Sequence, residues 1–456
     1  MVFTGIVMAI AFVMMVIYRL VNILPPAGIS KDTQAIAILN DASCAVCHQK
    51  DNKLPFYARF PGPENRFNKN AKRGILYFDI TETIEKINKK EAINETALAK
   101  IEMATTTGAM PPATFSLFHW GSSVTPAKQK ILKEWIDSHR KRFYPNHFAS
   151  DIFNTEPVRP LPPPVSVNKK KASLGEQLFY DTRLSSDNSI SCSSCHNLRT
   201  GGTDNRQYPE GINQILGNLN TPTVYNACCN NSHGWDGHIT DLKILIAEHM
   251  LSPYEMANQS FDHIVNRLLK DKDMKKAFDK LYKEGITETS IIDALEEFEK
   301  TLVTPDCRFD RYLKGEESVL NQTEIQGNNL FKSNKCATCH AGSAFGGQSE
   351  EVMGLYEDYF KNRGWEITEY DLGRYKQTLN EHDRYRFKVP GLRNVALTKP
   401  YFHDGSQQTL YDAVKTMGRY QSGCSIKDGD IKAIVSFLET LTGNTYTEEN
   451  EQVYKE

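Results

Sequence analysis

The sequence predicts a mainly α-helical protein built from three similar small domains, which follow one apolar N-terminal helix. Three observations predict this: a short cysteine–histidine motif occurs three times, two long segments contain the same parts in the same order, and the chain begins with an apolar run. Domains commonly have about 100–200 residues, so two to four of them are expected in 456 residues. The formal net charge of −2 offers no electrostatic basis for binding nucleic acid.

Residues 1–30 contain the apolar run. Residues 2–17 are almost wholly apolar, and residues 18–24 could extend the run to the roughly 20 residues that cross a bilayer. Arg19 lies near enough to one end for its side chain to reach the headgroups. A cleaved signal peptide is the alternative, but no basic segment precedes the run, and two prolines stand where a small-residue cleavage site would be expected. We therefore expect an uncleaved transmembrane helix.

The repeated motif is Cys-x-x-Cys-His. Its copies are Cys44, Cys47 and His48; Cys192, Cys195 and His196; and Cys336, Cys339 and His340. This spacing is the attachment signature of haem c, because two thiols one helical turn apart reach two vinyl groups and the histidine becomes the proximal iron ligand. A single copy could be a redox dithiol or half of a zinc site, but three copies without a second cysteine pair disfavour both.

We therefore predict three covalently bound haem c groups in three cytochrome c-like helical domains. Haem is attached covalently outside the bacterial cytoplasm, so these domains are expected in the periplasm, with the anchor in the inner membrane.

The motifs and linkers divide the chain. The expected parts are the transmembrane anchor at 1–30, an N-terminal mono-haem domain at 31–150, a proline-rich linker at 151–171, a second haem domain at 172–320 and a third haem domain at 321–456. The prolines of the linker favour extended polyproline geometry.

The last two domains contain the same parts in the same order. Residues 175–179 resemble 327–331, residues 221–226 resemble 389–394, and residues 235–237 resemble 403–405. This order predicts an internal duplication. The second copy carries an insertion at about residues 350–386.

The second axial ligand of each iron decides its function, because a haem with two strong ligands moves electrons whereas one with an open face does chemistry. In the N-terminal domain Met110, held by two following prolines, is the best candidate, with Met103 and His119 as alternatives. In the domain of the third motif Met417 is the candidate, although methionine often only fills gaps in a core.

In the domain of the second motif no methionine or histidine is equally obvious. Met250 and Met256 lie on the corresponding stretch, and Glu255 lies between expected helices near Pro253. A carboxylate over an open iron can take a proton from the near oxygen of peroxide and pass it to the far oxygen. A solvated surface carboxylate is the alternative for Glu255.

Four cysteines remain outside the motifs: Cys228, Cys229, Cys307 and Cys424. They fit no metal spacing, and adjacent cysteines are poorly placed to pair with each other. We expect free or partly buried thiols rather than disulfides.

From about residue 172 to residue 444 the chain resembles the bacterial di-haem cytochrome c peroxidase family, which includes the MauG-type enzymes. The matching segments are 175–184 with 191–196, 220–226, 235–237, 253–256, 301–305, 309–315, 392–398, 400–405 and 437–443. Residues 36–140 resemble a small single-haem domain family. With the anchor, the combination resembles tri-haem, membrane-bound peroxidases that draw electrons from quinol.

The resemblance implies roles for matching residues. The haem at His196 would reduce peroxide, and the haem at His340, with Met417, would donate the electrons. Trp235 would lie on the electron path between them. Glu255 matches the acid–base glutamate of the family.

The resemblance also implies a calcium site, and the chain departs from the family at two positions. The site would use Asn220 and the carbonyls of Thr398 and Pro400, and oxygen ligands suit Ca²⁺. Ile212 stands where the family often has a removable histidine ligand, and Leu245 stands in place of an active-site glutamine. The first departure predicts a constitutively open haem, and the second leaves the hydrogen bonding of peroxide undefined.

These observations predict a peroxidase that reduces hydrogen peroxide with electrons from quinol or from a small cytochrome or cupredoxin, as a possible homodimer. One alternative is a MauG-like oxidase of a protein substrate, although such enzymes have tyrosine where this chain has Met417. The other is an electron relay in which every iron has two axial ligands.

Overall fold

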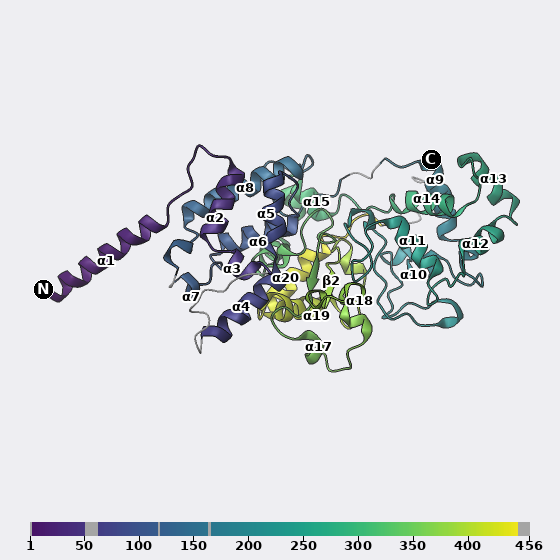
Figure 1. The fold of residues 1–456 in the computed structure, drawn as a ribbon. Helices are drawn as coiled ribbons and strands as arrows, with labels where there is room; N and C mark the ends of the chain where they lie inside the picture. Colours follow the sequence, from purple (N-terminus) through teal and green to yellow (C-terminus); the bar gives the residue numbers. More distant parts are fainter. Residues whose placement is uncertain (1, 51–62, 117–118, 163–165, 446–456) are drawn as a thin grey trace. The chain divides into compact units, whose positions relative to one another are not determined.

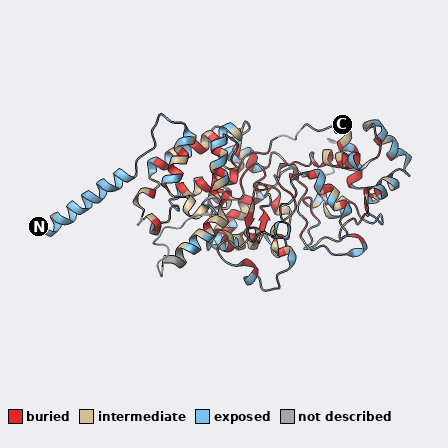
Figure 2. Ribbon diagram, in the orientation of Figure 1, coloured by how far each residue is buried: buried red, intermediate tan, exposed pale blue. Residues whose placement is uncertain are grey.

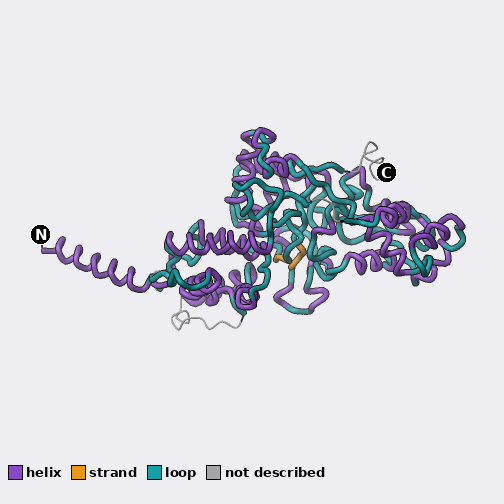
Figure 3. Tube along the Cα trace, turned by 90° about the horizontal axis from the view of Figure 1, so that it is seen from above, coloured by secondary structure: helices purple, strands orange, loops and turns teal. Residues whose placement is uncertain are grey.

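The computed structural model describes residues 2–50, 63–116, 119–162 and 166–445. The chain forms two compact units, Met1–Asn146 and His147–Glu456, and each is described by itself. Both units consist of helices joined by loops, with two short strands in the second unit (Figures 1 and 3). The predicted mainly helical fold is confirmed.

The first unit packs its helices around one apolar core. Its helices are α1 (Val2–Val21), α2 (Lys31–Asp41), α3 (Ala45–His48), α4 (Pro63–Tyr77), α5 (Ile80–Lys89), α6 (Glu95–Thr106), α7 (Ala113–Ser116) and α8 (Pro126–Phe143). The core side chains come mainly from α2, α5, α6 and α8. Pro126 stands at the first turn of α8, where its missing N–H costs no hydrogen bond, and the Thr125 side chain caps the same helix.

The predicted transmembrane helix is not confirmed. Among the residues that the structure describes, no helix is long and apolar enough to cross a membrane. The helix α1 has 20 residues and ends at Val21. The Asn22 side chain follows directly and donates hydrogen bonds to the carbonyls of Tyr18 and Trp120, at 3.0 and 2.6 Å. The described side chains of α1 are exposed (Figure 2).

The second unit contains the other two motifs. Its helices are α9 (Lys169–Phe179), α10 (Cys192–Cys195), α11 (Leu242–Leu251), α12 (Phe261–Leu268), α13 (Lys272–Leu281), α14 (Glu288–Glu299), α15 (Arg308–Leu313), α16 (Gln322–Ser333), α17 (Tyr359–Asn362), α18 (Tyr375–Thr378), α19 (Leu410–Met417) and α20 (Asp428–Glu439). One apolar cluster lies around the second motif and another around the third.

The predicted duplication is visible in two helix crossings. α9 packs on α14, and α16 packs on α20. A Cβ atom at Gly175 would lie 1.9 Å from the Ala294 carbonyl oxygen, and one at Gly327 would lie 2.0 Å from that of Ala433. Both crossings therefore require glycine, because any side chain would separate the helices.

The two copies meet at Thr304. Asn226 and Asn394 occupy equivalent places, each with a left-handed backbone (φ 60° and 61°). Both donate a side-chain hydrogen bond to the Thr304 hydroxyl, at 2.9 and 3.1 Å, and all three residues are buried.

The insertion of the second copy is closed at its base by a two-stranded antiparallel sheet. β1 (Glu350–Val352) pairs with β2 (Arg386–Lys388), with Glu351 opposite Phe387. The chain between the strands carries α17 and α18. Because the two paired strands lie at the two ends of the insertion, the chain leaves and re-enters the repeated fold at the same place.

The first part of the predicted linker packs into the second unit. Val158 and Leu161 are buried, and Val158 forms a parallel bridge with Gly342. The Arg159 carbonyl accepts a hydrogen bond from the Arg393 guanidinium at 2.9 Å. Of the linker prolines, Pro163 and Pro164 lie outside the described residues.

Candidate functional site

The three Cys-x-x-Cys-His motifs adopt the same local turn. In each, the backbone N–H of the histidine donates to the carbonyl of the first cysteine, at 3.1 Å for His48, 2.9 Å for His196 and 3.0 Å for His340. One turn therefore places both thiols and the imidazole on one side of the backbone. All ten cysteines lie in the described residues, and no disulfide joins any of them there.

The three imidazoles are oriented in the same way. Nδ1 is hydrogen-bonded to a backbone carbonyl in each: to Gly74 and Phe78 for His48, to Gly202 for His196 and to Phe345 for His340, at 3.0 to 3.3 Å. A carbonyl partner at Nδ1 leaves Nε2 as the ligand nitrogen and is typical of metal-binding histidines.

The protonation states of these histidines fit the same role. Burial lowers the pKa of His196 and of His340 to about 4, and it also lowers the pKa of His48. The neutral imidazole is the form that binds iron. The residues of all three motifs therefore fit haem c.

The second motif is accompanied by a histidine that sequence analysis missed. His249, in the last turn of α11, bonds through Nδ1 to the Glu255 carboxylate at 2.6 Å. Its ring lies 6.3 Å from the ring of His196, centroid to centroid, at 66°. His249 therefore holds Glu255 near the motif, while the Glu255 side chain stays 37% exposed.

The internal repeat could have identified His249. Asn226 and Asn394 differ by 168 positions, and so do the first residues of α11 and α19. The same offset pairs His249 with Met417.

The segment before Glu255 is fixed by a neighbouring loop. The Ile212 N–H donates to the Glu255 carbonyl at 3.1 Å, and a Cβ atom at Gly211 would lie 2.1 Å from the Tyr254 carbonyl oxygen. Ile212 is itself buried. An open cavity of about 380 Å³ lies beside this loop and the motif, and Ser194, Asn197, Arg206, Glu210 and Gly211 are among its lining residues.

Glu299 of α14 is a further acid near this motif that sequence analysis missed. Burial raises its pKa to about 7, and His249 opposes the rise. After burial, Glu299 is the largest contributor to the raised pKa of Cys192. The two methionines considered for this domain, Met250 and Met256, are buried in its apolar core, where packing explains them.

Met417 ends α19 and is followed by a π-helical turn, Gly418–Ser422. Such turns are frequent at functional sites. The N–H of Cys424 donates to the Gly418 carbonyl at 2.8 Å. Burial raises the pKa of Cys336 to about 12, and Cys339 and Cys424 raise it further. Cys424 therefore links the segment after Met417 to the third motif.

In the first unit, Met110 is partly exposed, and its N–H donates to the Ala104 carbonyl at 3.2 Å. Met103, on α6, is partly buried. The ring of His119 stacks on Phe115 at 4.0 Å. The three candidates therefore lie close together in sequence, between residues 103 and 119, and the choice among them stays a prediction.

Trp235 lies between the two copies. Its Nε1–H donates to the Asn220 carbonyl at 2.7 Å, and its ring lies 6.3 Å from that of His403. These rings occupy equivalent positions in the repeat. The Asn220 N–H donates to the His403 carbonyl at 2.8 Å.

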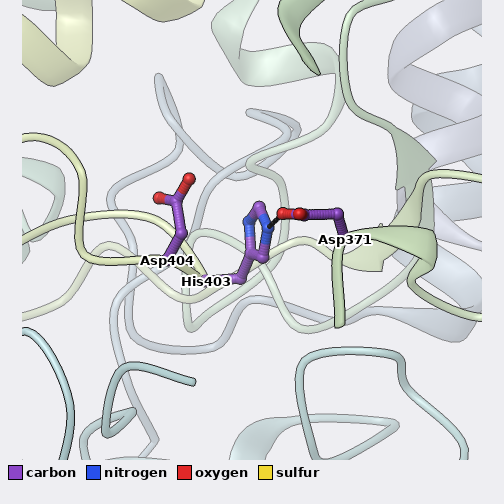
Figure 4. A group of neighbouring side chains, drawn as sticks. All are labelled: Asp371, His403 and Asp404. Carbon is purple, nitrogen blue, oxygen red and sulfur yellow. Dashed lines mark hydrogen bonds and ion pairs between the residues drawn. The ribbon is translucent and has the colours of Figure 1, made fainter. Parts of the chain in front are cut away.

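A buried ionic network continues from His403 (Figure 4). His403 Nε2 is 2.9 Å from Asp371 Oδ1. The Arg363 guanidinium pairs with Asp371 at 2.6 Å and with Asp404 at 2.9 Å. Burial would raise the pKa of Asp371, but Arg363 and His403 hold it far below the usual range.

Asp371, His403 and Asp404 lie close enough to hold a metal ion. The Arg363 guanidinium pairs with both carboxylates and offsets one of their two negative charges. We interpret the group as an ionic network.

The predicted calcium residues Asn220 and Pro400 lie on two segments that are joined by a hydrogen bond. The Asn220 N–H donates to the carbonyl of His403, which follows Pro400 by three positions. The Asn220 side-chain amide donates to the Arg206 carbonyl at 2.8 Å. The carbonyls of Thr398 and Pro400 stay a predicted part of this site.

Comparisons with known proteins match both the N-terminal region and the region of the second motif. A family model described as di-haem cytochrome c peroxidase matches residues 169–318, and one described as haem-binding domain matches residues 22–138. Cytochrome c peroxidase Ccp of Escherichia coli (strain K12) is 38% identical over 417 residues, which are 91% of this chain and 89% of that protein.

Two further proteins match the second unit. Cytochrome c551 peroxidase of Nitrosomonas europaea is 42% identical over 291 residues, covering 63% of this chain and 85% of that protein. The crystal structure of a MauG-like protein associated with microbial copper homeostasis has a TM-score of 0.57 and 26% identity, covering 62% of this chain and 94% of that one. By sequence and by fold, the chain belongs to the di-haem cytochrome c peroxidase family, with an additional N-terminal haem-binding domain, and it is a peroxidase.

Proposed function

We propose that this peroxidase carries three haem c groups, one at each Cys-x-x-Cys-His motif, and reduces hydrogen peroxide at the motif of His196. The common turn and the common orientation of the three histidines support the number of haems. The observation that carries the choice of motif is the Glu255 carboxylate, which His249 holds beside His196.

The reaction converts one peroxide, two electrons and two protons into two waters, with cleavage of the O–O bond. Bound haem iron supplies the electrons and the position at which peroxide binds. Glu255 takes the proton from the peroxide oxygen nearer the haem and delivers it to the oxygen farther from the haem, which leaves as water. General acid–base catalysis of this kind contributes about 10²–10⁴ in rate.

The other predicted site residues would bring electrons to the haem at His196. His340 and Met417 would hold the donor haem, and His48 and Met110 the haem of the N-terminal domain. Trp235 would lie on the electron path, since it joins the two copies through Asn220 and His403. A calcium ion held by Asn220, Thr398 and Pro400 would stabilise the same junction.

The electrons would come from a small cytochrome or cupredoxin, or from quinol. Three covalent haems place the protein in the periplasm, because attachment occurs there. The three motifs are shared by the enzyme and by a pure electron relay, so only turnover with peroxide distinguishes the two.

The test is stopped-flow absorbance of the fully reduced holoprotein mixed with a small excess of peroxide. We expect haem reoxidation within milliseconds to seconds, with two electrons consumed per peroxide. The control is a cytochrome in which every iron has two protein ligands. Reoxidation no faster than that of the control would contradict peroxide reduction at the motif of His196.

A further inference from the structure

We propose that Cys228 and Cys229 form a peroxide-sensitive dithiol, which hydrogen peroxide oxidises to a disulfide between the two neighbouring residues. The chain is a peroxidase, so this pair meets the oxidant whenever the enzyme works. The proposal does not depend on which haem reduces peroxide. The sequence-based expectation of free thiols then describes the reduced form of the protein.

The two thiols are already in contact. They end a short helical turn, Ala227–Cys229, in which the Cys229 N–H donates to the Asn226 carbonyl at 3.0 Å. Within this turn the Cys228 thiol donates a hydrogen bond to the Cys229 sulfur. Both residues are partly exposed, so a small oxidant can reach them. The backbone therefore presents a pair of sulfur atoms side by side at the surface.

The two thiols differ in acidity. The hydrogen bond from Cys228 lowers the pKa of Cys229, burial opposes this shift, and the Arg393 guanidinium lowers the pKa further. The same hydrogen bond, together with burial, raises the pKa of Cys228. Peroxide oxidises the thiolate form, and redox-sensor cysteines combine a low pKa with a neighbouring thiol that closes the disulfide. Cys229 is therefore the sulfur that reacts first, and Cys228 is the sulfur that completes the bond.

The reaction has two steps. The Cys229 thiolate attacks one oxygen of peroxide, so that an S–O bond forms, the O–O bond breaks and the other oxygen leaves as hydroxide. The Cys228 sulfur then attacks the Cys229 sulfur. The S–S bond forms, the S–O bond breaks, and the oxygen leaves as water with the proton of Cys228. In sum, two thiols and one peroxide give one disulfide and two waters, and the two electrons lost by sulfur reduce the peroxide.

The other two cysteines outside the motifs offer a comparison within the same chain. Cys307 is buried, its sulfur accepts a hydrogen bond from the Asp310 N–H at 3.4 Å, and burial raises its pKa to about 11. The Cys424 thiol donates to the Ser422 carbonyl at 3.5 Å. Neither residue is next to another cysteine in the sequence. We therefore expect peroxide to oxidise the pair before it oxidises Cys307 or Cys424.

The pair lies where the two copies meet. Gln348, from the second copy, donates to the Cys229 carbonyl at 3.3 Å, and Asn226 makes the bond to Thr304. Consecutive Cα atoms are about 3.8 Å apart, which is less than the separation of about 4.4–6.8 Å in most disulfides. The turn must therefore change when the disulfide closes, and a bond of this kind is easily reduced again. Oxidation is thus a reversible change at the junction of the copies.

The test is peptide mapping of holoprotein that has been reduced with dithiothreitol, desalted and exposed to a small excess of hydrogen peroxide. Free thiols are alkylated during denaturation, and trypsin then releases residues 207–243, which contain only these two cysteines. We expect this peptide to resist alkylation and to weigh about 2 Da less than its dithiol form, because two hydrogens are lost. Dithiothreitol should restore the dithiol. Residues 301–308 and 420–427, with Cys307 and Cys424, should stay fully alkylated.

Two variants separate the steps. In Cys228→Ser the sulfenic acid of Cys229 has no neighbouring thiol, so dimedone should trap it. In Cys229→Ser the Cys228 thiol should remain open to alkylation. Cys307→Ser is the matched control, because Cys307 contacts the same Arg393, and it should form the disulfide as the native chain does.

The native chain alone can overturn the proposal, so the result does not depend on how the variants fold. A peptide 207–243 that is still fully alkylated after peroxide would do so. So would equal oxidation of all four thiols, or a disulfide that links 207–243 to 301–308.

Discussion

The two copies within the second unit share a scaffold and differ where the distal ligand is placed. Gly175 and Gly327 make the same close helix crossing, and Asn226 and Asn394 make the same bond to Thr304. On α19 the equivalent position holds a methionine followed by a π-helical turn, whereas on α11 it holds a histidine bonded to a carboxylate. Under the proposed function, the two copies therefore differ in role through a few residues on one helix.

The largest effect is expected from Glu255→Gln, which removes the acid–base carboxylate from the first copy. We expect peroxide turnover per haem to fall by about 10²–10⁴, while haem content and internal electron transfer stay unchanged. Steady-state kinetics with a reduced cytochrome donor measure the loss. Glu284→Gln, at an exposed carboxylate of the same domain, is the control. Full turnover in Glu255→Gln would remove the acid–base role.

The next effect concerns the insertion, which the first copy lacks. Arg363→Ala leaves buried Asp371 and Asp404 without their cation, and breaking a buried pair in this way costs about 3–5 kcal/mol. Denaturant unfolding of the holoprotein measures the change. Arg384→Ala removes a surface pair with Glu381 from the same insertion and should cost about 0–1 kcal/mol.

The stability difference between the native chain and Arg363→Ala should also depend on pH. The pKa of Asp371 is lowered in the folded protein, so its stabilising contribution is present above the unfolded pKa of about 3.9 and is lost as the pH falls below it. We expect the difference in stability between the native chain and Arg363→Ala to shrink from pH 7 to about pH 3. A difference that grows on acidification would contradict the assigned ion pair.

A smaller free-energy change is expected from Met417→His. This variant gives the second copy the residue that stands at the equivalent position, 249, of the first copy. Met ligation raises a haem potential, so Met417→His should lower the potential of one haem by at least about 0.1 V, which is about 2.3 kcal/mol per electron. Spectroelectrochemical titration measures it, with Met353→Leu as the control. Three unchanged potentials would show that Met417 is not a ligand.

The smallest effect tests the shared part of the scaffold. Gly175→Ala and Gly327→Ala each place a methyl group against a backbone carbonyl, and overpacking of this kind costs about 1–3 kcal/mol. We expect similar losses at both sites in thermal unfolding. Gly429→Ala on α20 meets no atom within 4 Å and should be neutral or slightly stabilising. Unequal losses at the two crossings would argue that the copies have diverged in packing as well.

Features encoded by local sequence were predictable. Each Cys-x-x-Cys-His motif forms its turn from adjacent residues, and Gly175 and Gly327 stand before the motifs in a pattern that a duplication explains. Features that depend on contacts between distant segments were not. His249 looks like an ordinary helical residue until folding places it beside His196, and Arg363 meets Asp404 only because the insertion folds back over the repeat.

Thr304 has a consequence for the evolution of the chain. A hydroxyl oxygen offers two lone pairs, and here Asn226 and Asn394 take one each. The corresponding end of the second copy has Gly443, at which a Cβ atom would lie 2.3 Å from the Thr304 carbonyl oxygen. The Gly443 N–H donates to Asn394 Oδ1 at 3.0 Å, so Gly443 supplies a backbone partner but no hydroxyl. Separating the two copies would remove the Thr304 acceptor from the Asn394 side-chain NH2, so any change at Thr304 during evolution affects both copies.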